Sequence, residues 1–147
     1  NKTKFVSFKN SYHGDTTDAM SLADLNSGMH KKFKKLLLKN HSIDLPINQK
    51  ELDKFEEFLK KKHSELAAIF MEPMVQCAGG MRFIDPKITK KIHTLAKKYN
   101  ILFVADECAV GFYRSGKKFG FTHSKIKPDI LLYAHRYTHR LNNRYLD

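Results

Sequence analysis

Residues 101–116 read ILFVADECAVGFYRSG, an apolar run that passes directly into two acids. Five consecutive apolar residues, Ile101 to Ala105, predict a buried strand that ends at Asp106. In open α/β sheets, the carboxyl ends of the strands form the edge where ligands bind. Because a buried carboxylate needs a compensating partner, we expect Asp106 to meet a cation at that edge.

The rest of the chain predicts strands that alternate with helices. Short apolar runs predict strands at residues 4–8, 66–71 and 128–132. Apolar side chains at three- and four-residue spacing predict amphipathic helices over about residues 49–63 and 86–99. Strand–helix–strand units of this length predict an α/β fold, a mainly parallel sheet with flanking helices whose loops converge at one edge.

Residues 25–48 have no sustained apolar period. They contain Gly28 and Pro46, which interrupt regular structure. We therefore expect a long loop there, with one short helix at most.

Composition places the chain among ordinary globular proteins, with 41% hydrophobic and 29% charged residues. No apolar run is long enough for a membrane span, and no signal peptide opens the chain. The first residue is Asn1 and a strand follows almost at once, so we expect residues upstream. Cys77 and Cys108 have neither disulfide-framework nor zinc-ligand spacing, which favours a reducing, cytoplasmic location.

The net charge of +12 raises an alternative function, a basic module that binds nucleic acid. The lysine clusters at residues 31–35, 60–62 and 90–91 fall on expected solvent-facing surfaces. Aromatic residues do not interleave with them as they do in RNA-stacking sheets. A basic but ordinary surface is therefore favoured, and salt-dependent binding to nucleic acid would reveal the alternative.

The loop after the first predicted strand carries polar and aromatic side chains. Tyr12 could stack on a planar ring, or be an exposed aromatic at a helix start. Asp15 could orient a cation or cap a helix that begins near Thr16.

Two further predicted loops lead to the same edge. Glu72 ends a buried strand, and Gly79-Gly80 follows in a loop that could also be a plain connection. After Asp106, Arg114 could pair with Glu107, Asp15 or a substrate carboxylate. One such segment is weak evidence for a functional site, whereas three in this order indicate a single site.

Together these segments resemble the class-III, fold-type-I aminotransferases that use pyridoxal phosphate. The matching blocks are YHGDT (12–16) with AMS (19–21) and GMH (28–30), EPMVQ (72–76) with AGGMR (78–82), and DE (106–107) through KPDIL (127–131). The pairing of YHGDT with GMH is similar to the branch of this family that acts in biotin biosynthesis. The resemblance implies that residues 1–132 form part of the large domain of a pyridoxal-phosphate-dependent transferase fold.

The resemblance also implies roles for five residues around the cofactor. The aspartate at the position of Asp106 pairs with the protonated pyridine nitrogen, so that the ring can accept electrons. Tyr12 would stack on one face of the ring, next to His13, and Cys108 would pack near the other. Glu72 would contact the residues that bind the cofactor and not the cofactor itself.

The family's reaction implies an amino donor and a keto acid acceptor as small-molecule partners, and a homodimer as the assembly. Asp15 and Arg114 would shape the substrate pocket. We expect no metal site, because His135 and His139 at four-residue spacing in an atypical tail, with Cys108, are a weak ligand set.

Residues 133–147 depart from the family pattern. In an alignment without gaps, His135 takes the place of the Schiff-base lysine, and imidazole cannot form that bond. This tail also holds Arg136, Arg140 and Arg144, three of the five arginines in the chain. We interpret it as a foreign or frameshifted end; the lysine motif in a shifted frame just downstream would support this, and its absence would refute it.

The family's phosphate-binding turn and small domain also fall outside the sequence. We therefore expect an inactive fragment, or pseudoenzyme, of this family. The remaining alternative is a fragment that acts only with a partner chain, one that supplies the lysine and the small domain.

Overall fold

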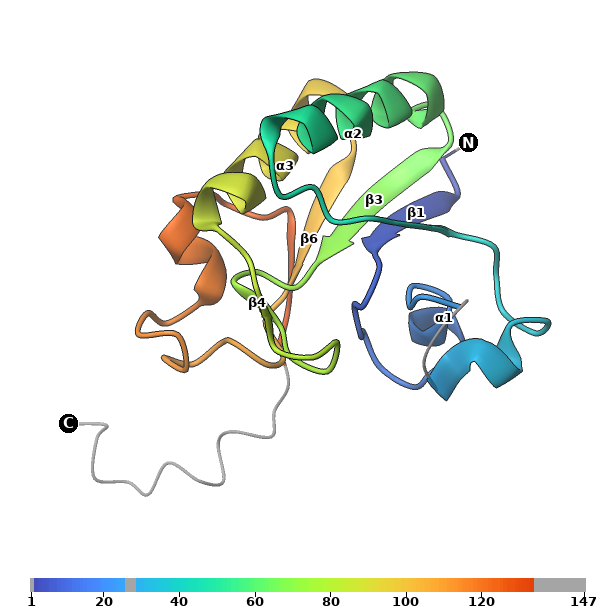
Figure 1. Ribbon diagram of the computed structural model, residues 1–147, viewed down its shortest axis with the longest axis horizontal. Coiled ribbons are helices and arrows are strands. Elements are labelled where there is room, and N and C mark those ends of the chain that lie inside the picture. Colours follow the sequence, from blue (N-terminus) through green and yellow to red (C-terminus); the bar gives the residue numbers. More distant parts are fainter. Residues whose placement is uncertain (1, 26–28, 134–147) are drawn as a thin grey trace.

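The computed structural model describes residues 2–25 and 29–133 (Figure 1). Its elements follow in the order β1 (Lys4–Phe8), α1 (Thr17–Met20), the 3-10 helix η1 (Met29–Phe33), β2 (His41–Ile43), α2 (Gln49–Lys62), β3 (Leu66–Met71), β4 (Val75–Gln76), β5 (Arg82–Phe83), α3 (Pro86–Lys98), β6 (Leu102–Asp106), the 3-10 helix η2 (Gly120–Ser124) and β7 (Ile130–Leu132). Strands and helices alternate, which confirms the predicted α/β class. No helix in these ranges is both long and apolar enough to cross a bilayer.

Within the described residues, five strands form one parallel sheet in the order β2-β1-β3-β6-β7. Phe5 on β1 is in register with Ala68 on β3, which is in register with Leu102 on β6. All four strands predicted from apolar runs are present. β6 begins at Leu102, one residue after the start of the apolar run, and ends at Asp106, which pairs with Leu132 on β7.

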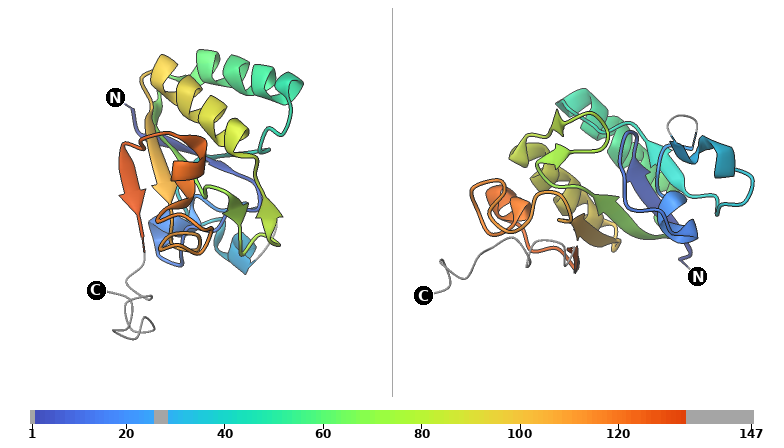
Figure 2. Two further views of the ribbon diagram at one scale, coloured as in Figure 1. Left: turned by 90° about the vertical axis from the view of Figure 1, so that its left-hand side faces the viewer. Right: turned by 90° about the horizontal axis from the view of Figure 1, so that it is seen from below.

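Helices α2 and α3 lie side by side over one face of the sheet (Figures 1 and 2). Each begins at a side-chain cap: Asn48 accepts from the N–H of Glu51, and Asp85 accepts from the N–H of Lys87. Each turns a buried apolar stripe toward the sheet, made of Leu52, Phe55, Leu59, Ile88, Ile92 and Ala96. The helices thus supply one half of the core, and β1, β3 and β6 supply the other.

The apolar pattern does not predict the short strands β2, β4 and β5. Residues 25–48 contain η1, as expected of a loop with one short helix, but also β2, where Val6 is in register with His41. The β4–β5 hairpin pairs Val75 with Phe83. No residue of β2 or β5 is buried, so backbone pairing alone defines these strands.

The strand order reverses between β1 and β3. β2 lies on one side of β1, whereas β3, β6 and β7 follow in sequence on the other. In open parallel sheets, ligands bind beyond the carboxyl ends of the strands at such a reversal. The loops that follow β1, β3 and β6 all begin at this edge.

Candidate functional site

Three loops meet beyond the carboxyl ends of β1, β3 and β6. The backbone N–H of Tyr12 donates to Oε2 of Glu72 at 3.1 Å. Nδ1 of His13 lies 2.8 Å from Oδ2 of Asp106. The reversal of strand order therefore carries one imidazole and two carboxylates, and we call Tyr12, His13, Glu72 and Asp106 the Asp106 cluster.

Asp106 is buried, with 4% of its surface exposed, and stays ionised. Burial is the largest influence and acts to raise the pKa of its carboxyl, but the hydrogen bond and charge interaction with His13 and the hydrogen bonds from Cys108 together outweigh it. The N–H of Cys108, 3.1 Å from Oδ1, acts in the same direction, and the pKa of Asp106 is lowered. Because a carboxylate only accepts, Nδ1 of His13 carries the proton of their bond.

Glu72 is about as buried as Asp106, but its pKa is shifted in the opposite direction. Burial raises the pKa of its carboxyl to about 7, and the negative charge of Asp106 adds to the effect. The N–H of Tyr12 and interactions with His13 oppose the rise only in part. The two carboxyl groups near His13 thus differ in pKa: Asp106 is ionised at neutral pH, and Glu72 can exchange a proton there.

His13 has one nitrogen left over. Its side chain is 1% exposed, and its ring meets the Phe70 ring edge to face at 5.8 Å. Within the described residues, the buried Nε2 atom has no hydrogen-bond partner. A buried polar atom without a partner is costly, which marks this side of the Asp106 cluster as prepared for a further group.

Tyr12 is held by two residues outside the strand ends. Its hydroxyl donates to Oδ2 of Asp15 at 2.7 Å, and its ring stacks on the His30 ring with centroids 5.8 Å apart. Nε2 of His30 lies 3.0 Å from the other oxygen of Asp15. Thr16 caps α1 by accepting from the N–H of Ala19, so Asp15 serves the aromatic pair and not the helix start.

The loop at residues 72–81 packs against the end of β1. The Gln76 side chain donates to the carbonyl oxygen of Lys9 at 3.0 Å. At Gly79, a Cβ atom would lie 1.8 Å from the backbone oxygen of Asn10, so only glycine permits this approach. The loop is thereby held against the segment that carries Tyr12 and His13.

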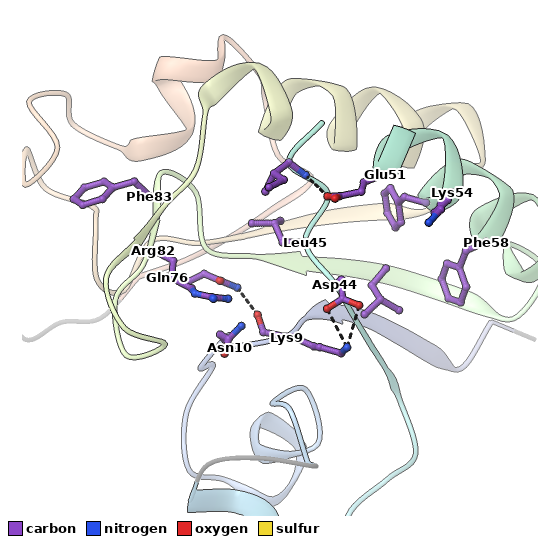
Figure 3. A pocket seen from close by; sticks show the side chains of 13 residues that line it. Lys9, Asn10, Asp44, Leu45, Glu51, Lys54, Phe58, Gln76, Arg82 and Phe83 are labelled. Carbon is purple, nitrogen blue, oxygen red and sulfur yellow. Dashed lines mark hydrogen bonds and ion pairs between the residues drawn. The ribbon is translucent and has the colours of Figure 1, made fainter. Parts of the chain in front are cut away.

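A groove of about 740 Å³ opens beside this contact (Figure 3). It lies between the ends of β1 and β2, the start of α2 and the β4–β5 hairpin. Lys9 crosses it to Asp44 at 2.9 Å, and Phe58 and Phe83 form part of its wall. No member of the Asp106 cluster lines the groove, so the two features are separate.

Cys108 and Arg114 follow β6 in the chain, and Cys108 lies directly beside Asp106. Cys108 is exposed, yet partial desolvation together with the hydrogen bond and charge of Asp106 raises the pKa of its thiol to about 12. The thiol is therefore neutral at pH 7 and a poor nucleophile. The charge of Arg114 acts on Cys77, where it opposes the burial that raises the pKa of that thiol.

Glu107, the second acid of the pair, serves the fold. It is 1% exposed, and its two oxygens accept 2.8 Å hydrogen bonds from the backbone N–H groups of Gly120 and Phe121. Consecutive residues at a strand end point to opposite sides, so Asp106 and Glu107 face different surroundings. Within the described ranges, no group of three His, Cys, Asp or Glu residues could hold a metal ion.

The fold and the order of these segments can be compared with known proteins. A family model described as aminotransferase class-III matches residues 1–139. The chain belongs to this family. Family members use pyridoxal phosphate as their cofactor, which the motifs at residues 12–16, 72–76 and 106–107 predict.

Curated relatives point to one branch of the family. The chain is 42% identical over 137 residues to adenosylmethionine-8-amino-7-oxononanoate aminotransferase from Buchnera aphidicola subsp. Schizaphis graminum, covering 88% of the chain and 32% of the relative. The Staphylococcus aureus protein of the same name is 35% identical over 143 residues, covering 88% and 31%. The chain thus spans about a third of the length of these relatives.

Solved structures of aminotransferases share the fold of this chain. The adenosylmethionine-8-amino-7-oxononanoate aminotransferase from Methanocaldococcus jannaschii superposes with a TM-score of 0.76 at 30% identity, covering 88% of the chain and 30% of that structure. A Bacillus anthracis aminotransferase reaches a TM-score of 0.81 at 24% identity, over 90% and 32%, and shows the shared fold. The prediction of a large-domain α/β architecture is confirmed.

The structure connects most of the predicted site residues. Tyr12 is hydrogen-bonded to Glu72 and its neighbour His13 to Asp106, and the N–H of Cys108 donates to Asp106. The carboxylates of Asp15 and Glu107, two partners considered for Arg114, accept the other hydrogen bonds described above. His135, His139 and the rest of the tail after Tyr133 lie outside the described residues.

His30 is a site residue that the sequence does not predict. It belongs to the GMH block at residues 28–30, which is typical of the family branch but carries no indication of a role for this side chain. The two blocks occur together in one family branch, but sequence alone does not show that their side chains touch; the ring contact between Tyr12 and His30 appears only in the structure.

Proposed function

We propose that the described part of the chain is a pyridoxal-phosphate-binding portion of a class-III aminotransferase large domain. One observation carries this proposal: a buried carboxylate, Asp106, is kept ionised at the strand-order reversal. A buried anion of lowered pKa fits the protonated ring nitrogen of the cofactor. The partnerless Nε2 of His13 lies on the same cluster and also fits an added polar group.

The residues of the site would divide the work as follows. Asp106 would hold the protonated pyridine nitrogen, and His13, hydrogen-bonded to Asp106, would keep that carboxylate oriented. Tyr12 would stack on one ring face, with Cys108 near the other, and Glu72 fixes the backbone of Tyr12. When bound, pyridoxal phosphate supplies an electron-accepting ring for amino-group transfer.

The names of the relatives refine the proposal. We place the chain with the transaminases of biotin biosynthesis, acting between an amino donor and a keto acid in the whole protein. Asp15 and Arg114 would border the substrate. As in the family, the whole protein would act as a homodimer.

We further propose that this chain alone does not catalyse transamination. His135 stands at the position of the Schiff-base lysine, and its imidazole cannot bond to the cofactor aldehyde as an amine does. The chain would keep the residues that cradle the ring and lack the group that attaches it.

Titration of the purified chain with pyridoxal phosphate tests both statements. We expect saturable, dialysable binding by induced circular dichroism, and no specific adduct after borohydride reduction and peptide mass spectrometry. Asp106→Asn should weaken binding at least tenfold, about 1.4 kcal/mol, while Asp18→Asn on α1 should not. Absence of binding, or equal binding by Asp106→Asn, would refute the cofactor site.

A borohydride-trapped adduct at one lysine, prevented by Asp106→Asn, would refute the inactivity proposal. Such an adduct would show that another lysine of this chain replaces the missing one. Trapping only in the presence of a second polypeptide would identify a partner-dependent enzyme instead.

A further inference from the structure

His30 is connected to Tyr12 by two routes. The two rings stack with an interplanar angle of 19°. Asp15 also bridges them, because one carboxylate oxygen accepts from the Tyr12 hydroxyl and the other lies 3.0 Å from Nε2 of His30. Ring contact and hydrogen bonds together close a three-residue unit, which we call the Tyr12 clamp.

His30 and Asp15 differ in burial, and this difference separates their roles. The His30 side chain is 6% exposed, so its ring forms a fixed surface, whereas the Asp15 side chain is 68% exposed. His30 lies on η1, and Tyr12 lies in the loop after β1, so the clamp joins separate segments. The orientation of Tyr12 is therefore set by a contact between two separate segments of the fold, and not by its own loop alone.

A side chain held in place loses less conformational entropy when a ligand arrives. An unrestrained tyrosine rotates about two side-chain bonds, and both are restricted here, by the stacked ring and by the hydroxyl hydrogen bond. Aromatic stacking also depends on ring orientation. The clamp thus prepares Tyr12 to receive a flat ring.

We propose that His30 is a positioning residue, which holds Tyr12 in the orientation that stacks on the pyridine ring. This inference rests on the proposed function, since it assigns the cofactor as the ring that Tyr12 receives. His30 would act through Tyr12 and Asp15, the two side chains that it contacts. The GMH block, used above only to recognise the family branch, thereby gains a physical role.

The test uses pyridoxamine 5'-phosphate, which has no aldehyde and binds without a lysine. Its Kd for the 147-residue chain is measured from the induced circular dichroism of the ligand band. His30→Leu removes ring and donor and should raise Kd about tenfold. His30→Phe keeps a ring and His30→Gln keeps a donor, and each should raise Kd only about threefold.

Partial rescue by two unlike side chains separates positioning from a structural role. Loss through misfolding would follow the unfolding midpoint of each variant, which is measured in parallel. Asp15→Ala removes both hydrogen bonds at an exposed residue and should raise Kd about threefold. Asp18→Ala, the matched control on α1, should leave Kd unchanged.

The outcomes separate this inference from the proposed function. Binding by His30→Leu within twofold of the parent chain, while Asp106→Asn loses affinity, overturns the role of His30 alone. If His30→Leu does not fold, an unchanged Kd for Asp15→Ala overturns the clamp. Absence of binding by the parent chain overturns the cofactor site, and the role of His30 with it.

Discussion

Replacement of Glu72 by glutamine should flatten the dependence of stability on pH near neutrality. Glu72 is 5% exposed, and burial is the largest cause that raises its pKa to about 7 from the ordinary 4.5. The folded chain therefore keeps a proton at Glu72 that the unfolded chain releases above about pH 4.5. Glutamine has nearly the same volume, stays neutral at every pH, and can still accept from the N–H of Tyr12.

The sign and size follow from proton linkage. Because the folded pKa is raised, the stability from protonated Glu72 is complete below about pH 4.5 and is lost as pH rises through about 7. At 1.36 kcal/mol per pH unit, the difference between 4.5 and about 7 corresponds to about 3 kcal/mol. The Glu72→Gln variant should thus gain about 3 kcal/mol relative to the parent chain between pH 4.5 and pH 8.

Urea unfolding at several pH values measures this difference. Glu57→Gln is the matched control, because Glu57 lies exposed on α2; its difference from the parent chain should stay constant over the same range. Parallel profiles for Glu72→Gln and the parent chain, within about 1 kcal/mol from pH 4.5 to 8, would refute the argument that Glu72 is buried and protonated.

Two other substitutions test how the loops are held. Gly79→Ala should destabilise the chain by about 3 kcal/mol in urea unfolding, because the added Cβ would meet the Asn10 backbone. Gly80→Ala, the control, should destabilise the chain by only about 1 kcal/mol, from its positive φ. Equal losses of stability for the two variants would contradict the close approach at Gly79. Glu107→Ala should cost about 4 kcal/mol, since two backbone N–H groups lose their acceptor, and Glu107→Gln should cost less. A loss below about 1 kcal/mol for Glu107→Ala would show that Glu107 does not hold η2 in place.

Much of the architecture follows from local pattern. The apolar spacing on α2 and α3 and the apolar runs of β1, β3, β6 and β7 predict those elements to within one or two residues. Their caps, Asn48 and Asp85, are typical of helix starts. Such signals are local, because side-chain burial on one face repeats with the period of the element itself.

The pattern also predicts part of the site. Asp106 at the end of a buried strand, and the order of the blocks around Tyr12 and Glu72, predict the family, which the comparisons confirm. The two- and three-residue strands β2, β4 and β5 are missed, because pairing with a distant backbone defines them.

By itself, the sequence determined the α/β class, the buried acid at a strand end and the family. Only the tertiary structure decided which side chain that acid meets: His13, 93 positions earlier in the chain. It also turned Glu107 toward the backbone of η2 and tied Asp15 to Tyr12 and His30. The reason is physical, because periodicity records which face of an element is buried, whereas the partner of a buried charge depends on the register of strands that are remote in sequence.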